Sequence, residues 1–274
     1  MHRARLRAAV ALLATVVVFG TAGESPATAA ASTYTHGFDV SWPQCRGHAA
    51  HHMPSARPSY AILGLTHGTG HTVNPCLSSQ LRWARSHHVK VGGYLVASYP
   101  TRHQRARANH GLYGRCHGRL MCRLHNDGAR QVVDALRTLH RHHMRSPMVW
   151  LDVEFRHQQP WTHSNRRNRA VIEGMVRELR HRHKRFGVYT THLMWRDLVG
   201  HYRLVVPQWL PSGHGKARPT KPMCRRTATG GQTWLVQYTR HLDEDLTCPV
   251  LDATRNHALG AGHGFLLSRI VARV

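Results

Sequence analysis

Acidic residues are scarce in this sequence of 274 residues, because 13 Asp and Glu stand against 38 Lys and Arg, for a formal net charge of +25. When acids are so few, those that follow apolar segments are candidates for a functional site. The positive charge is spread over the chain and predicts non-specific binding of polyanions at low salt. No recognised nucleic-acid-binding motif accompanies it, so no specific nucleic-acid partner is expected.

Patterns that mark metal and nucleotide sites are also missing. The sequence contains 26 histidines but no His-Glu-x-x-His motif, and its histidine runs lie among arginines, whose charge repels a metal ion. No glycine-rich phosphate loop follows the first candidate strand, which removes the usual support for a nucleotide-binding open sheet. We therefore expect neither a metal nor a cofactor.

The apolar run near the amino terminus is too short to cross a membrane. Ala8–Gly20 follows an arginine-rich start and precedes a small, polar stretch with possible cleavage sites between Ala27 and Ala31. This order is typical of a secretory signal peptide, and the run is shorter than the roughly 20 residues that span hydrocarbon. We predict a signal peptide over residues 1–31 and a secreted or wall-associated mature domain over residues 32–274, without a membrane span after cleavage.

The six cysteines do not show the paired C-x-x-C spacing of zinc sites. An even number of cysteines in an exported chain favours disulfides. Sequence alone cannot choose among the possible pairings, but we prefer the sequential one. It joins Cys45 to Cys76, Cys116 to Cys122, and Cys224 to Cys248.

No linker or internal repeat divides the mature chain, so we expect one domain. Short apolar runs alternate with amphipathic segments, which is typical of parallel strands with covering helices, and little helix is expected after Trp195. The predicted fold is α/β, a single irregular (β/α) barrel whose later strands carry few helices, with an open doubly wound sheet as the alternative. The expected strands are Thr35–Trp42, Tyr60–Thr66, Val91–Ser98, Met148–Glu154, Phe186–Thr190, Leu204–Trp209 and Thr233–Tyr238, and the expected helices are Leu77–His87, Gly128–His143 and Arg166–His183.

The expected helix Arg166–His183 shows whether the many cations are exposed to solvent. Its apolar residues recur at helical spacing, while its other faces are basic. We expect Ile172, Met175 and Leu179 to be buried, and Arg169, Arg177, Arg180 and His181 to be exposed.

Two carboxylates end the apolar segment Met148–Glu154. Side chains alternate along a strand, so Asp152 and Glu154 point to the same face. The carboxyl ends of parallel barrel strands build active sites, and two acids there can divide the work of glycoside cleavage. One protonates the leaving oxygen, and the other stabilises positive charge at the anomeric carbon or activates the attacking group.

Further acids follow other predicted strands. Asp39 shares a face of the first strand with Gly37 and Ser41, and Asp243 and Asp245 follow the last expected strand, where they compete for one role. The alternative is that these acids form ion pairs with some of the arginines.

Five short segments resemble, in order, the strand motifs of glycoside hydrolase family 25, the lysozyme-like muramidases, here in a secreted actinobacterial-type member. They span almost the whole mature chain. The segments are Gly37–Ser41, Val91–Tyr94, Trp150–Glu154, Gly187–Thr190, and Trp234–Thr239 followed by Leu242-Asp243.

The resemblance implies cleavage of the bond between N-acetylmuramic acid and N-acetylglucosamine in peptidoglycan, the expected partner. It makes Glu154 the general acid and Asp152 the carboxylate that orients the acetamido group or stabilises the oxocarbenium-like centre. Asp39 and Asp243 then line the same pocket. The candidates for a sugar-binding wall are Tyr94, Tyr189, Trp209 and Tyr238.

The chain also departs from the family pattern. Where the family continues its third strand from Tyr into His and an aromatic residue, this chain has Leu95 and Val96. A catalytically weak or inactive protein that binds wall glycan on the same barrel is therefore the alternative function.

Overall fold

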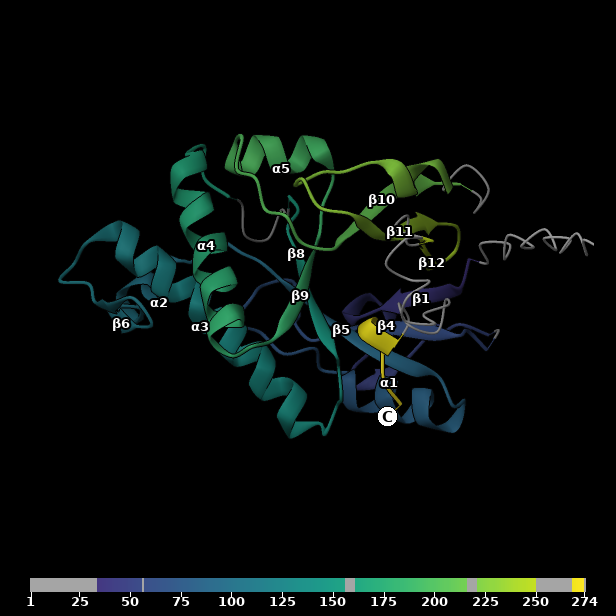
Figure 1. Ribbon diagram of the computed structural model, residues 1–274. Coiled ribbons are helices and arrows are strands. Elements are labelled where there is room, and N and C mark those ends of the chain that lie inside the picture. The colour runs from purple at the N-terminus through teal and green to yellow at the C-terminus, as the bar shows by residue number, and fades with distance from the viewer. Residues whose placement is uncertain (1–33, 56, 156–160, 216–220, 250–267, 274) are drawn as a thin grey trace, which may run out of the picture. The chain divides into compact units, whose positions relative to one another are not determined.

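The computed structural model describes residues 34–55, 57–155, 161–215, 221–249 and 268–273 (Figure 1). The chain divides into two units, Met1–Ala31 and Ser32–Val274, and all the described residues belong to the second. The expected signal peptide lies outside the described residues. Within the described ranges, no helix has both the length and the apolar character needed to cross a membrane.

Eight strands close into a barrel, which confirms the predicted architecture over the open sheet. Their neighbour order is β1-β12-β11-β10-β9-β8-β5-β4, and β4 closes the ring on β1. All neighbours are parallel except β12, which pairs antiparallel with both β11 and β1. The strands are β1 His36–Val40, β4 Tyr60–Gly64, β5 Lys90–Val96, β8 Met148–Asp152, β9 Arg185–Tyr189, β10 Gln208–His214, β11 Thr233–Thr239 and β12 Asp243–Thr247.

β12 was not expected as a strand. It begins with three acidic residues, which have low strand propensity, but it fills the gap between two neighbours that pair with it along its length. The expected strand Leu204–Trp209 forms only from Gln208 onward, as the start of β10. Pro207 comes directly before it and has no N–H to donate to a ladder.

The helices lie outside the barrel, and the second of them packs against the third rather than against the strands (Figure 1). They are α1 Leu77–Ser86, α2 Arg102–Arg107, α3 Leu120–Arg141, α4 Asn165–His181 and α5 His192–Val199. α2 and α5 were not expected, and α3 begins at Leu120 rather than at Gly128. Short elements complete the described chain: the 3-10 helices η1 Trp42–Gln44 and η2 Lys221–Arg225, and the hairpins β2 Cys45–Arg46 with β3 Ala49–Ala50, and β6 His110–Gly111 with β7 Gly114–Arg115.

Two glycines allow α3 and α4 to pack closely. A Cβ on Gly128 would lie 2.0 Å from the carbonyl oxygen of Val171, and one on Gly174 would lie 2.0 Å from that of His125. The predicted faces of α4 are confirmed, because Ile172, Met175 and Leu179 are fully buried. The exposed residues are Arg169, Arg177, Arg180 and His181, as expected.

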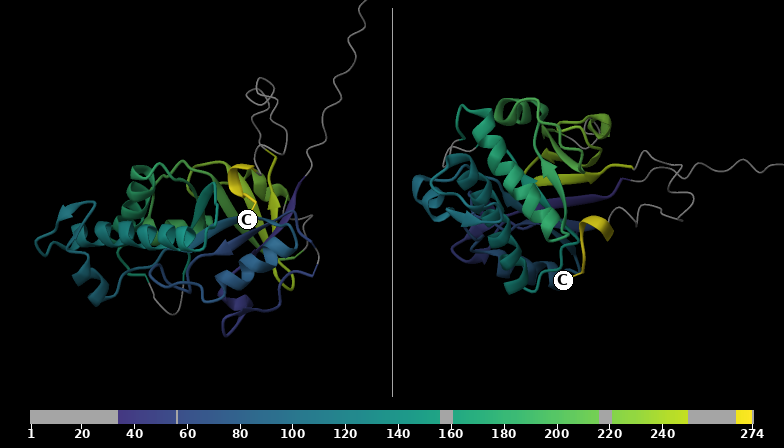
Figure 2. Two further views of the ribbon diagram at one scale, coloured as in Figure 1. Left: turned by 90° about the horizontal axis from the view of Figure 1, so that it is seen from below. Right: turned by 60° about the vertical axis from the view of Figure 1, so that its left-hand side comes forward.

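Strand alternation separates the apolar core into two layers. One layer packs between the strands and the helices, and the other fills the barrel interior with side chains such as Ile62, Trp150 and Leu235. Ile270 and Val271, from the C-terminal segment, also enter the interior layer, and Ala272 pairs with Val91 at the start of β5. Figure 2 shows this segment, in yellow, beside the barrel strands. It therefore covers the end of the barrel at which the parallel strands begin.

The sequential cysteine pairing is confirmed. Cys45 is bonded to Cys76 with a Cα–Cα distance of 5.8 Å, so the segment after β1 is tied to the start of α1. The other bonds join Cys116 to Cys122 and Cys224 to Cys248.

Candidate active site

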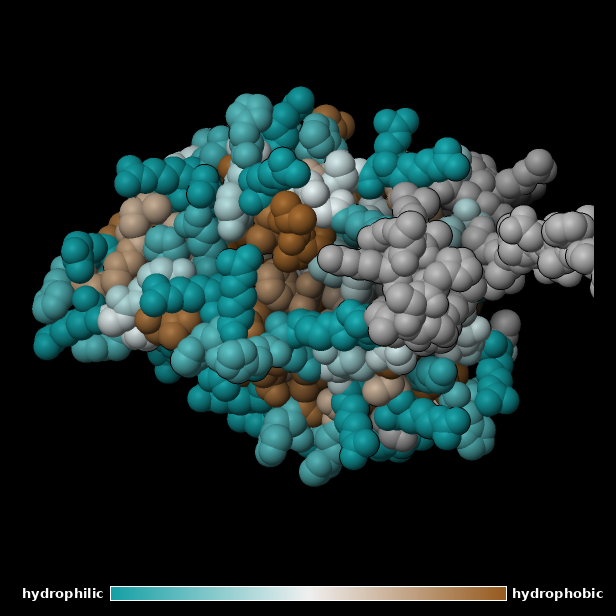
Figure 3. Space-filling view, in the orientation of Figure 1, coloured by the Kyte–Doolittle hydropathy of each residue, from teal (hydrophilic) through white to brown (hydrophobic). Residues whose placement is uncertain are grey.

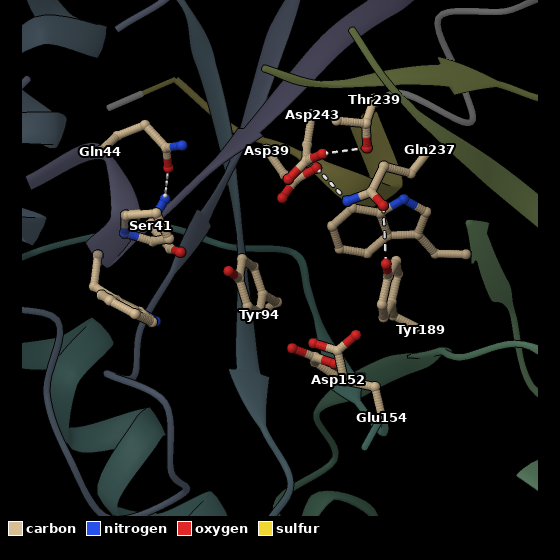
Figure 4. Close-up of a pocket in the computed structure, with 13 residues that line it drawn as sticks. Asp39, Ser41, Gln44, Tyr94, Asp152, Glu154, Tyr189, Gln237, Thr239 and Asp243 are labelled. Carbon is tan, nitrogen blue, oxygen red and sulfur yellow. Dashed lines mark hydrogen bonds between the residues drawn. The ribbon is translucent and has the colours of Figure 1, made fainter. Parts of the chain in front are cut away.

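A cavity of about 340 Å³ opens where the parallel strands end (Figure 4). Most of its lining is polar or aromatic, and it comes from seven barrel strands and the segments that follow them. The lining residues are Asp39, Ser41, Trp42, Pro43, Gln44, Tyr94, Asp152, Glu154, Tyr189, Trp209, Gln237, Thr239 and Asp243.

The structure brings four of the predicted acids to this cavity. Asp39 lies on β1, Asp152 ends β8, Glu154 follows two residues later, and Asp243 begins β12. In Figure 4, Asp152 and Glu154 lie on one side of the cavity, and Asp39 and Asp243 lie on the other. The spacing of two residues places the first pair on one face, as strand alternation predicts.

Asp39 and Asp243 accept hydrogen bonds from uncharged side chains. The Gln237 amide donates a hydrogen bond of 2.8 Å to Asp39 Oδ2, and the Tyr189 hydroxyl donates one of 2.8 Å to Gln237 Oε1. The Thr239 hydroxyl donates one of 2.6 Å to Asp243 Oδ1. In the described ranges, neither Asp39 nor Asp243 forms an ion pair with Arg or Lys, so the ion-pair alternative does not apply to them.

The Asp39 carboxyl is buried and surrounded by negative charge. Burial raises its pKa well above the usual range, the charges of Asp245 and Asp243 raise it further, and the hydrogen bond from Gln237 lowers it. These surroundings therefore disfavour the ionised form of the Asp39 carboxyl.

The pKa of the Tyr189 hydroxyl shows that the four acids lie close together. Burial raises the pKa of its hydroxyl well above the usual value, and the charges of Glu154, Asp152, Asp39 and Asp243 each raise it further. One phenol thus experiences all four carboxylates.

The structure separates Asp243 from Asp245. Both point to the same face of β12, but Asp243 lines the cavity, whereas Asp245 is fully buried beneath it. The Trp209 indole donates a hydrogen bond of 2.8 Å to Asp245 Oδ1, and Oδ2 has no hydrogen-bond partner among the residues described. Burial raises the pKa of Asp245, the bond from Trp209 lowers it, and Asp243 raises it.

Three of the four predicted aromatic residues line the cavity. The Trp209 ring lies between Tyr94 and Tyr189, with centroid distances of 6.0 and 4.7 Å. Tyr238 does not reach the cavity, which corrects the expectation. It follows Gln237 on β11 and so points to the opposite face, where its hydroxyl donates to Glu244 Oε2 at 2.7 Å.

Several lining residues were not predicted. Gln237 and Thr239 alternate on β11 with residues that face outward, a pattern that was readable once one cavity-facing residue was known. The segment Trp42–Gln44 forms a short helix at the cavity rim, where the Gln44 side chain accepts a hydrogen bond of 2.9 Å from the Ser41 backbone N–H. No group of three or more metal-ligating side chains is placed to hold a metal ion in the part of the chain that the structure describes.

Comparison with known proteins agrees with this architecture. The family model described as lysozyme-like protein 1 matches residues 119–218. No curated protein matches the sequence.

Solved structures extend the likeness over most of the chain. A family GH25 lysozyme from Aspergillus fumigatus is 17% identical, with a TM-score of 0.52, and the match covers 84% of this chain and 100% of that one. A bacterial lysozyme from Streptomyces coelicolor is 18% identical, with a TM-score of 0.51 and coverage of 84% and 98%. A muramidase from Trichobolus zukalii is 17% identical, with a TM-score of 0.51 and coverage of 83% and 100%. The chain therefore has the fold of the GH25 lysozymes.

Proposed function

We propose that this protein is a secreted glycoside hydrolase that cleaves peptidoglycan at the bond between N-acetylmuramic acid and N-acetylglucosamine. The observation that carries the proposal is the pair Asp152 and Glu154, which lines one cavity at the end of β8 together with Asp39 and Asp243. Shared architecture with lysozymes from a fungus and a bacterium supports the choice of a glycan substrate.

Glu154 is the proton donor in this proposal. Its side chain is partly exposed and lines the cavity, so it is accessible to a glycosidic oxygen. Its backbone is held by the Trp161 indole, which donates a hydrogen bond of 3.0 Å to the Glu154 carbonyl oxygen. The Glu154 proton passes to the leaving oxygen as the glycosidic bond breaks.

Asp152 is the partner carboxylate. It is 3% exposed and lies at the end of a fully buried strand, so its position is fixed by the barrel. In this place it orients the acetamido group of the substrate or stabilises the positive charge that develops at the anomeric carbon.

The other two acids tune the cavity. The raised pKa of Asp39 makes its ionisation less favourable, and Gln237 and Thr239 fix the orientations of Asp39 and Asp243. Tyr94, Tyr189 and Trp209 form the wall against which the apolar faces of sugar rings pack.

The mature protein acts outside the cell in this proposal. The predicted signal peptide over residues 1–31 directs export, and the three disulfides suit an oxidising compartment. The partner there is peptidoglycan or a related wall glycan.

A dye-release assay on purified peptidoglycan tests the proposal with two matched variants. Glu154→Gln keeps the shape of the side chain and loses the transferable proton, so activity should fall by about 10²- to 10⁴-fold. Glu244→Gln makes the same chemical change on β12, away from the cavity lining, and should retain activity.

Two outcomes would contradict this assignment. Full activity in Glu154→Gln would remove the role of the proton donor. A wild-type protein that binds peptidoglycan but releases no dye would replace the hydrolase with the wall-binding alternative.

A further inference from the structure

Cations gather at the end of the barrel opposite the acidic cavity. A second hollow, of about 500 Å³, lies where the parallel strands begin, and we call it the basal pocket. Its lining residues are Arg57, Ala84, Arg85, His88, Val89, Lys90 and Arg273.

The basal cations come from separate segments of the chain. Arg85 belongs to the last turn of α1, where a cation also complements the helix dipole. The dipole does not account for the others, because Arg57 precedes β4, Lys90 begins β5, and Arg273 follows the bridge between Val91 and Ala272. Several segments thus deliver positive charge to one hollow.

No acidic residue lines this pocket. Arg57, Arg85, Lys90 and Arg273 form no ion pair with any acid that the structure describes. Elsewhere on the surface, several arginines are paired within their own helix, such as Arg169 with Glu173 at 2.7 Å. The basal pocket therefore concentrates cations that no described protein carboxylate neutralises.

Another pair of cations extends this positive end. Arg185 begins β9, and its pKa is lowered first by burial and then by the charge of Arg269. Figure 3 shows that hydrophilic side chains cover much of the displayed face, so high polarity alone does not distinguish a site on this protein. The basal pocket is distinguished instead by cations from separate segments, namely the one before β4, the end of α1, the start of β5 and the C-terminal segment.

We propose that the basal pocket binds a phosphodiester-linked anionic polymer of the cell wall, a single flexible chain of the poly(glycerol phosphate) type. Phosphate groups carry the negative charge that would neutralise the arginines of the pocket. A thin chain can enter a hollow of this size, whereas duplex nucleic acid presents a broad, stiff surface. The predicted export places the protein among wall polymers rather than genomic DNA. Glycan at the cavity and polymer at the basal pocket then occupy opposite ends of the barrel and need not compete.

Fluorescence anisotropy with a labelled glycerol phosphate oligomer tests this proposal on the mature chain. The basal variant carries Arg57→Gln, Arg85→Gln and Arg273→Gln. The control removes the same charge from exposed arginines outside the pocket, through Arg102→Gln, Arg107→Gln and Arg166→Gln. Thermal melts verify that both variants are folded.

The basal variant is expected to bind the oligomer about tenfold more weakly at physiological salt, and the slope of log K against log salt should shrink by about 2, at about 0.7 for each lost phosphate contact. The control should bind nearly as the wild type does. Equal losses in both variants would show that the charge acts diffusely and would overturn the site, as would no measurable binding by the wild type.

Duplex DNA of matched charge is the second probe. Because it should contact the surface broadly, it is expected to lose affinity equally in both variants. A loss confined to the basal variant would make nucleic acid the occupant and would overturn the wall polymer. Peptidoglycan hydrolysis is measured separately, so failure here and failure of the proposed hydrolase are distinguishable.

Discussion

Two clusters of carboxylates in this protein have opposite electrostatic character. In the cavity, Asp39 is surrounded by other acids and receives its hydrogen bond from a neutral amide, and its pKa is raised. On the outer side of the barrel, Asp127 and Asp134 of α3 clasp His71, at 3.2 and 3.0 Å. There burial raises the pKa of Asp134, but the interactions with His71, Arg130 and Arg137 together lower it more, and the net shift is downward.

The difference separates acids that stabilise the fold from acids that cost stability. His71 belongs to the loop after β4, and its two bonds fasten that loop to α3. Burial lowers the pKa of His71, but the two carboxylates raise it to about 9. The cavity acids have no such compensation from Arg or Lys at Asp39, Asp243 or Asp245 among the residues described. Such an electrostatic cost to stability is expected where carboxylates are retained for catalysis.

The largest effect on stability is expected from breaking the outer cluster. Asp127 is fully buried and accepts hydrogen bonds from His71 and from Gln131 Nε2, the latter at 2.9 Å. Asp127→Asn leaves His71 with a single carboxylate partner, the partly exposed Asp134, and should lower the free energy of unfolding by about 3 kcal/mol. Urea unfolding measures this loss, and the activity of the folded fraction should be unchanged. If this variant were as stable as the wild type, the outer cluster would not stabilise the fold.

The pH dependence of stability gives the next largest effect. The folded-state pKa of His71 is raised from 6.5 to about 9, so its stabilisation is fully present below pH 6.5 and is lost as pH rises through about 9. The loss should be on the order of 2–3 kcal/mol. Unfolding curves from pH 6 to pH 10 follow it, with His71→Gln as the control in which this step disappears. An equal step in the control would assign the titration to another group.

The smallest expected effect is a gain in stability on replacing Asp39, in contrast to the loss expected on replacing Asp127. The raised pKa of Asp39 means that its contribution to stability is present below the unfolded-state pKa and is lost as pH rises through the folded-state pKa. Asp39→Asn keeps an acceptor for Gln237 and removes the charge, so it should raise the free energy of unfolding at pH 8 by roughly 1 kcal/mol, a size common for single substitutions. Differential scanning calorimetry compares the two proteins. Destabilisation by this variant would show that the charged form is the favoured one.

Much of the fold was predictable because its signals are local. Apolar runs located seven of the eight barrel strands at least in part, and alternation placed Asp152 and Glu154 on one face. β12 was missed because its pairing with β1 and β11 is a long-range effect that its acidic start does not announce. α2 was missed because it is a single short helix within a basic insertion.

The sequence predicted which residues of the candidate site share a strand face, but not which of them reach the cavity. Asp243 and Asp245 share a face, and only the closed barrel determines that the first lines the cavity and the second lies beneath it. Tyr238 was assigned by residue type, although its neighbour Gln237 occupies the cavity-facing position. Choosing between adjacent strand residues requires the register against β12, which local patterns do not contain.

The covering of the barrel base has a consequence for how the chain folds during synthesis. Ile270 and Val271 belong to the same interior layer as Ile62, from β4, so residues about two hundred positions apart share one core. At about 5–20 residues per second, β4 emerges from the ribosome well before this segment does. Until then, the barrel interior is open at its base to water and to other chains. A chaperone or translocation partner that shields this opening would therefore act until Ile270 and Val271 have joined the interior layer.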